Sequence, residues 1–121
     1  MTASHLTPAA FGYRLPAEWE PHAATWLAWP HNQETWPGKF EAIPEIYVQL
    51  VKAIHRAEQV NICVNDTSTA TRVQQQLHAA GVVLSQVALH EIPTNDAWAR
   101  DHGPIFLTRR YGDPAELTLT D

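Results

Sequence analysis

The segment at residues 94–104, with the sequence TNDAWARDHGP, holds the densest group of side chains that could do chemistry. Two carboxylates, Asp96 and Asp101, flank the flat indole of Trp98. A carboxylate can accept paired N–H bonds from a guanidinium, and an indole stacked on the same cation contributes about 0.5–2 kcal/mol. These residue types favour a site for a planar cation, on a loop between two strands.

The same residues also allow a purely structural interpretation. Asp101 could accept backbone N–H bonds in the turn before Gly103, or pair with its neighbour Arg100. Trp98 could simply fill part of the core. The residue types alone do not choose between these alternatives.

Three other kinds of residue are candidates for chemistry. Trp36 lies in a loop-like stretch, 30–39, as either a lid over a pocket or a packing anchor. Cys63, the one cysteine, sits in an apolar run, which predicts a structural thiol with a raised pKa and no nucleophilic role. The seven histidines are scattered without the spacing of a zinc site, so we expect no metal.

Strands and helices that alternate along the chain must position these residues. Apolar runs bounded by turn residues predict strands, and three- and four-residue apolar spacing predicts helices, in the order β-α-β-α-β-β. This order is typical of an α/β chain with at least one parallel strand pair and a helix-covered face. The expected elements are a buried strand at 23–29, a helix within 40–58, a strand at 59–65, a helix at 67–80, and strands at 87–92, 105–108 and 116–120.

The helices carry their own signals. Pro44 is tolerated only in a first turn, so the first helix should begin near Ile43. We expect its apolar stripe to face the core and His55 to be solvated. In the second helix the 65–67 segment offers an N-cap and Gly81 a C′ residue. The first helix's stripe would be Ile43, Ile46, Tyr47, Leu50, Ile54 and Ala57; the second's would be Ala70, Val73, Leu77 and Ala80.

Composition limits the class of protein. The 121 residues with a net charge of -5 fit one domain at most, expected at 16–121 after an extended or loose arm at 1–15. We expect Trp19 to anchor the irregular segment 16–22. No basic patch suggests nucleic acid, no signal peptide is evident, and no apolar run approaches the ~20 residues that span a bilayer. A single cysteine favours a reducing, cytoplasmic setting.

Three motifs give the chain a family resemblance. They are LPAEWEPH at 15–22 with ATWLAWP at 24–30, WPGKF at 36–40, and the 94–104 segment. Together they resemble the agmatine deiminase family, which includes the bacterial-type peptidyl-arginine deiminases. The resemblance runs from about Tyr13 and corresponds to the N-terminal portion of a full-length member.

The resemblance implies a pentein propeller, of which this chain would supply the first module and the start of the next. Members deiminate agmatine to N-carbamoylputrescine and ammonia, on the way to putrescine, or act on peptidyl arginine; no cofactor is needed. The family's Trp-x-x-Asp pair matches Trp98 and Asp101. This match implies a substrate-binding Asp101 with Trp98 as a pocket wall. Further binding residues expected from the resemblance are Asn95 and Asp96, with Trp29 and Trp36 lining the entrance of the pocket.

The family's nucleophilic Cys, catalytic His and second carboxylate come from later in the chain. Neither Cys63 nor His102 takes their place, and the sequence stops abruptly in an expected strand. We therefore expect the chain to hold one side of the site, to be inactive alone, and to self-associate through exposed module edges. The alternatives are a non-catalytic guanidinium-binding module and an inert remnant. The motifs leave agmatine and peptidyl arginine open as substrates, with agmatine favoured by overall similarity.

Overall fold

The computed structural model describes residues 7–109 and the backbone of 116–120, which fall into two compact units. One unit is the continuous stretch 22–101. The other combines the described residues before 22 with those after 101. No helix among the described residues has both the length and the apolar character to cross a membrane.

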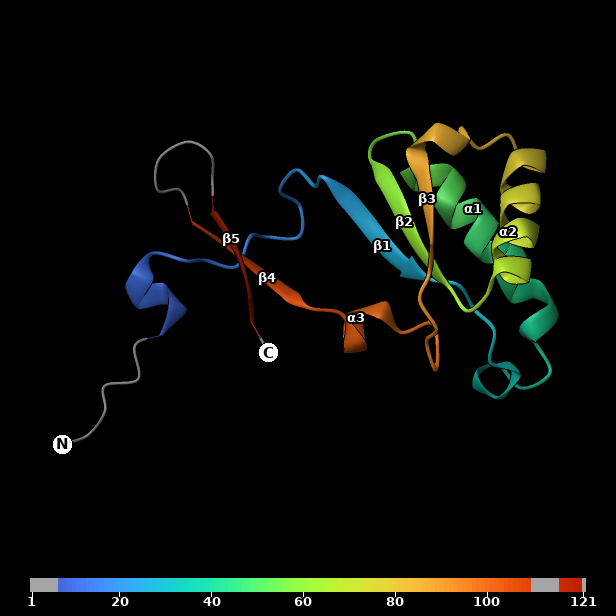
Figure 1. Cartoon of the computed structure of the whole chain (residues 1–121), viewed down its shortest axis with the longest axis horizontal. Helices are drawn as coiled ribbons and strands as arrows, with labels where there is room; N and C mark the ends of the chain where they lie inside the picture. Colours follow the sequence, from blue (N-terminus) through green and yellow to red (C-terminus); the bar gives the residue numbers. More distant parts are fainter. Residues whose placement is uncertain (1–6, 110–115, 121) are drawn as a thin grey trace. The chain divides into compact units, whose positions relative to one another are not determined.

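Unit 22–101 is built on a three-stranded parallel sheet (Figure 1). Strands β1 (Ala24–Ala28), β2 (Gln59–Val64) and β3 (Val87–Glu91) lie in the order β1-β2-β3. Helices α1 (Ile43–Ile54) and α2 (Thr67–Ala79) connect successive strands and pack on one face of the sheet. The predicted order and the predicted parallel pairing are confirmed.

The core lies between the sheet and the two helices. Val60, Ile62 and Val64 of β2 are fully buried and share a cluster with residues of both helices. Because side chains alternate along a strand, the intervening residues face the other way. There Trp26 stacks on His90 with ring centroids 4.9 Å apart, and His90 Nε2 lies 2.9 Å from Asn61 Oδ1. Burial along β1 is mixed, since Ala28 is 1% exposed and Trp26 is 48% exposed, so the expectation of a buried strand holds only in part.

Helix α1 differs from its predicted stripe. A 3₁₀ helix, Phe40–Ala42, precedes it, and α1 begins at Ile43 as Pro44 indicated. Its buried residues are Val48 and Val51, whereas Ile46 is 56% exposed. Residues two positions apart lie on nearly opposite sides of a helix, so burying Val48 turns Ile46 outward. Tyr47 and Ile54 of the predicted stripe also pack against the core, whereas Leu50 is 40% exposed, so the buried face is rotated from the predicted stripe toward the two valines.

His55 is also placed differently from the expectation. It is only 8% exposed, and its Nδ1 lies 2.8 Å from the Lys52 carbonyl oxygen. The prediction of a solvated histidine was wrong because His55 is the C-cap of α1, where its ring reaches the last carbonyls of the helix.

Helix α2 follows its predicted caps and stripe. Asp66 Oδ1 accepts the Thr69 backbone N–H at 2.7 Å, and this bond is the largest cause of the lowered pKa of Asp66. Val73 and Leu77 are fully buried. Gly81 adopts φ +79° just beyond the helix, a conformation that glycine adopts without strain.

The second unit contains an antiparallel pair, β4 (Ile105–Arg109) and β5 (Glu116–Thr120). Both predicted strands are present, and most of the expected turn between them lies outside the described residues. A bridge joins Arg14 to Thr108. The segment expected as a loose arm forms a 3₁₀ helix at Pro8–Phe11, which proline favours at its start and Gly12 ends at φ 80°.

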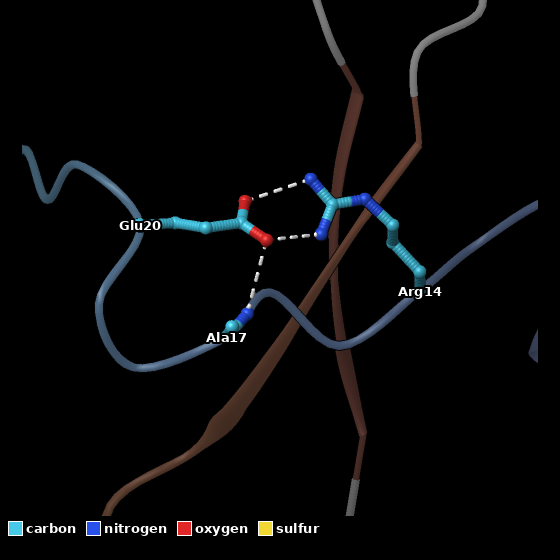
Figure 2. A network of polar contacts seen from close by, with 3 residues as sticks. All are labelled: Arg14, Ala17 and Glu20. Atoms are coloured by element: carbon cyan, nitrogen blue, oxygen red, sulfur yellow. Dashed lines mark hydrogen bonds and ion pairs between the residues drawn. The ribbon is translucent and has the colours of Figure 1, made fainter.

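The 14–20 segment is closed by an ion pair (Figure 2). The Arg14 guanidinium donates two hydrogen bonds to the Glu20 carboxylate at 2.7 and 2.8 Å, and the Ala17 backbone N–H donates a third. Trp19 is 89% exposed, so its expected anchoring role was wrong. Within this segment Glu20, rather than the indole, supplies the cross-link.

Candidate functional site

Three loops meet at the carboxyl edge of the parallel sheet, where α/β proteins commonly bind ligands. The residue that directly follows β2, Asn65, joins the loop that follows β3. Its Oδ1 accepts the Thr94 backbone N–H at 2.9 Å, and its Nδ2 donates to the Thr94 carbonyl oxygen at 3.4 Å. The paired bonds hold the start of the 94–101 segment to the central strand.

The loop after β1 is joined to the same segment by Asp96. Thr35 Oγ1 donates a hydrogen bond to Asp96 Oδ2, and the Ala97 backbone N–H donates to Asp96 Oδ1 at 2.7 Å. The bond from Thr35 is the largest cause of the lowered pKa of Asp96, because it stabilises the charged form. His31 Nε2 lies 3.5 Å from Thr94 Oγ1, a weaker contact between the same two loops.

Two of the predicted aromatic residues come together here. The rings of Trp36 and Trp98 are 5.8 Å apart at an interplanar angle of 37°, and Trp36 also contacts Phe40. Trp98 is 48% exposed. The interpretation of Trp98 as a core residue is therefore excluded, and Trp36 packs directly on the indole that the sequence placed in the site.

Trp29 occupies a different environment. It is 3% exposed, belongs to the core cluster, and meets Tyr47 edge-on at 5.9 Å. Burial raises the pKa of Tyr47, and the nearby charge of Asp96 adds to the rise. The structure gives Trp29 a packing role in this unit, and its expected place at a pocket entrance stays a prediction.

Asp101 lies in a one-turn helix, α3 (Ala99–His102), inside the segment predicted to be a loop between two strands. Its backbone N–H donates to the Trp98 carbonyl oxygen at 3.0 Å, which fixes the turn between the two residues. Its side chain is exposed, and its carboxylate accepts no hydrogen bond from any described residue. The structural alternative, a carboxylate occupied by turn N–H groups or by Arg100, is therefore absent from the described part of the chain.

The remaining candidates, Asn95 and Cys63, are not among the residues whose contacts join the loops. Asn95 is exposed. Cys63 is half-buried within β2, and burial raises the pKa of its thiol, as a structural cysteine predicts. Sequence reasoning missed Thr35 as a partner of Asp96. It placed Asn65 at a helix start and not in the site, although a polar residue directly after a strand was an available signal.

The fold and the two tryptophan-bearing loops define an α/β sheet module with a candidate site at the carboxyl edge of its strands. The family whose sequence pattern matches is the Porphyromonas-type peptidyl-arginine deiminases, and the match covers residues 14–119. The chain belongs to this family.

Similar proteins agree with this assignment. The agmatine deiminase of Pseudomonas aeruginosa is 36% identical over 88% of this chain and 27% of its own length, and that of Ectopseudomonas mendocina is 34% identical over 93% and 29%. Among solved structures, the agmatine deiminase of Enterococcus faecalis matches with a TM-score of 0.75 at 28% identity, covering 93% of this chain and 28% of that one. The chain thus spans less than a third of the length of these relatives.

Proposed function

We propose that this chain forms one side of the guanidinium site of an agmatine-deiminating hydrolase. Asp101 binds the guanidinium nitrogens, and Trp98 lies against the cation or its alkyl chain. The observation that carries the proposal is the exposure of the Asp101 carboxylate and its lack of hydrogen bonds from the described residues. This carboxylate stands three positions from an exposed indole in a segment held to the sheet edge. Family membership supports the same assignment.

The proposed reaction replaces one guanidinium nitrogen of agmatine by the oxygen of water, giving N-carbamoylputrescine, a precursor of putrescine, and ammonia. The guanidinium carbon is protected by charge delocalisation, so a carboxylate that orients it within reach of a thiolate contributes to the rate. The described residues suit binding and orientation. Cys63, half-buried in a strand with a raised pKa, does not suit attack, so the proposal places the nucleophile in another part of the protein.

At the level of the fold, we propose that the sheet with α1 and α2 is one module of a pentein propeller and that β4 and β5 begin the next. The similarity to the Enterococcus faecalis enzyme supports this arrangement. In such an arrangement the ends of the strands of each module would border a shared central site.

Peptidyl arginine is the second candidate substrate. The description of the matching family names peptidyl-arginine deiminases, whereas the similar curated proteins are agmatine deiminases. Both substrates present the same guanidinium to Asp101. They differ at the far end of the molecule, where agmatine carries an amine and the peptide carries its backbone.

The proposal is tested in a chimera of the Pseudomonas aeruginosa enzyme, in which residues 14–119 of this chain replace the matching segment of that enzyme. The chimera is expected to deiminate agmatine, and Asp101→Asn should lower kcat/KM by about 100-fold or more because it weakens a charged clamp. Glu45→Gln, on the exposed side of α1, is the control. An arginyl peptide is assayed in parallel to separate the two substrates.

Near-normal kcat/KM in an active Asp101→Asn chimera would refute the role of this carboxylate. If the chimera fails to fold, the same variants are compared in agmatine titrations of the 121-residue chain followed by NMR. There the expected result is loss of agmatine-induced shifts in Asp101→Asn alone, and equal shifts in both variants would contradict the proposal.

A further inference from the structure

We propose that Asp96 is a positioning residue and does not contact the substrate, and that Thr35 is its partner in holding the Trp36 loop against Trp98. The two indoles then form one aromatic wall of the guanidinium site. The identity of the cation rests on the proposed function above. The role of the Thr35–Asp96 pair in joining the two loops is independent of the proposed function.

The first argument is the occupancy of the two carboxylates. One oxygen of Asp96 accepts a hydrogen bond from the Thr35 hydroxyl, and the other accepts one from the Ala97 backbone N–H. The Asp101 carboxylate accepts nothing from the described residues. A guanidinium clamp needs oxygens that can accept two parallel N–H bonds, and a carboxylate already engaged on both oxygens suits this poorly. The geometry favours positioning over the direct contact expected for Asp96.

The second argument is the route by which the loops are connected. The 94–101 segment is held to β2 by the paired bonds of Asn65 and Thr94. The loop after β1 reaches that segment through Thr35 and through the ring of Trp36. Because Thr35 and Trp36 are adjacent, the hydrogen bond and the ring contact act at the same place. Removing the hydrogen bond should loosen the contact between the indoles.

A third observation concerns where the hydrogen bond lies along the chain. Thr35 directly precedes Trp36, and Asp96 stands two positions before Trp98. The hydrogen bond therefore joins the two loops next to both indoles.

The experiment follows the indole N–H resonances of Trp36 and Trp98 by NMR in the 121-residue chain without ligand. Thr35→Val and Asp96→Asn should both shift these two resonances, whereas Thr35→Ser keeps the hydroxyl and should leave them near their original positions. Thr71→Val, at an exposed threonine on α2, is the matched control and is expected to leave them unchanged. Unchanged indole resonances in both Thr35→Val and Asp96→Asn would overturn the proposal.

Agmatine titration of the same variants separates positioning from direct contact. If Asp96 acts through position, Thr35→Val and Asp96→Asn should weaken agmatine binding to a similar extent, about three- to tenfold, and the double variant should be no weaker than either. Full agmatine binding by Thr35→Val, together with loss of binding in Asp96→Asn, would show that Asp96 contacts the ligand directly and would contradict the proposal. If the parent chain binds no agmatine, the chimera decides the proposed function, and the indole resonances decide whether Thr35 and Asp96 join the loops.

Discussion

Two aspartates five residues apart have different surroundings in this protein. Asp96 accepts hydrogen bonds from residues of two loops, and Asp101 presents an exposed carboxylate at the end of a short helical turn. Both are acidic residues in one motif, so their spacing does not distinguish them. The hydrogen bonds each one accepts give the reason for assigning the positioning role to Asp96 and the binding role to Asp101.

At the residue scale, the pH dependence of folding should depend on the capping carboxylate Asp66. Hydrogen bonds formed only in the folded state lower the pKa of Asp66 below its ordinary value of 3.8. A group with a depressed folded pKa stabilises the protein above the unfolded pKa, and this contribution is lost as pH falls through the folded pKa. Asp66→Asn keeps the capping oxygen but cannot titrate.

The stability advantage of the parent chain over Asp66→Asn should therefore be largest above pH ~4 and vanish in stronger acid. Urea unfolding at a series of pH values measures it. A difference that is constant across the whole range would contradict the assigned role. Asp96, whose pKa is lowered by Thr35, should contribute to the same acid sensitivity.

At the scale of elements, each helix contributes to the site by covering the sheet that supports the loops. Helix α2 buries Val73 and Leu77 in the cluster that includes all of the buried valines of β2. The Asn65 side chain follows the last of these valines directly. Packing of α2 is therefore linked to the position of the Thr94 segment.

Leu77→Ala should destabilise the protein by about 2–5 kcal/mol, because it removes a fully buried side chain and leaves a cavity. Gln75→Ala, on the exposed side of the same helix, should change the free energy of unfolding by less than about 0.5 kcal/mol. Chemical denaturation measures both. Equal effects of the two substitutions would show that α2 does not pack on the sheet as described.

At the scale of the molecule, the core and the candidate site belong to the same compact unit. Every residue of the core cluster lies between Trp29 and Val82, and the site residues lie between His31 and Asp101. The described residues of the other unit contribute none of them. The unit therefore has a hydrophobic core of its own.

A chain limited to residues 22–101 should accordingly unfold cooperatively and retain the indole resonances of Trp36 and Trp98. Circular dichroism during urea unfolding and NMR of the folded form are the measurements. The Leu77→Ala variant of this shorter chain is the control, since it should lose stability as the full chain does. A shorter chain without a cooperative transition would show that the core depends on the remaining residues.

Several features followed from local sequence alone. The order of the strands and the two long helices, the start of α1 at Ile43, the caps of α2 and the raised pKa of Cys63 were all predicted correctly. Each depends on a residue's own backbone preference or on neighbours within a few positions. The 94–104 segment was singled out for the same reason, as a dense polar and aromatic motif between two strands.

Tertiary structure decided the rest. Apolar residues lie on more than one side of α1, and only packing on the sheet selected Val48 and Val51 over Ile46 and Leu50 as the buried residues. Thr35 and Asp96 are 61 positions apart, so no local pattern could pair them. Parallel strands bring their carboxyl ends to one edge, and there the distant residue Thr35 engages one oxygen of Asp96 while the adjacent Ala97 N–H engages the other. The Asp101 carboxylate stays exposed.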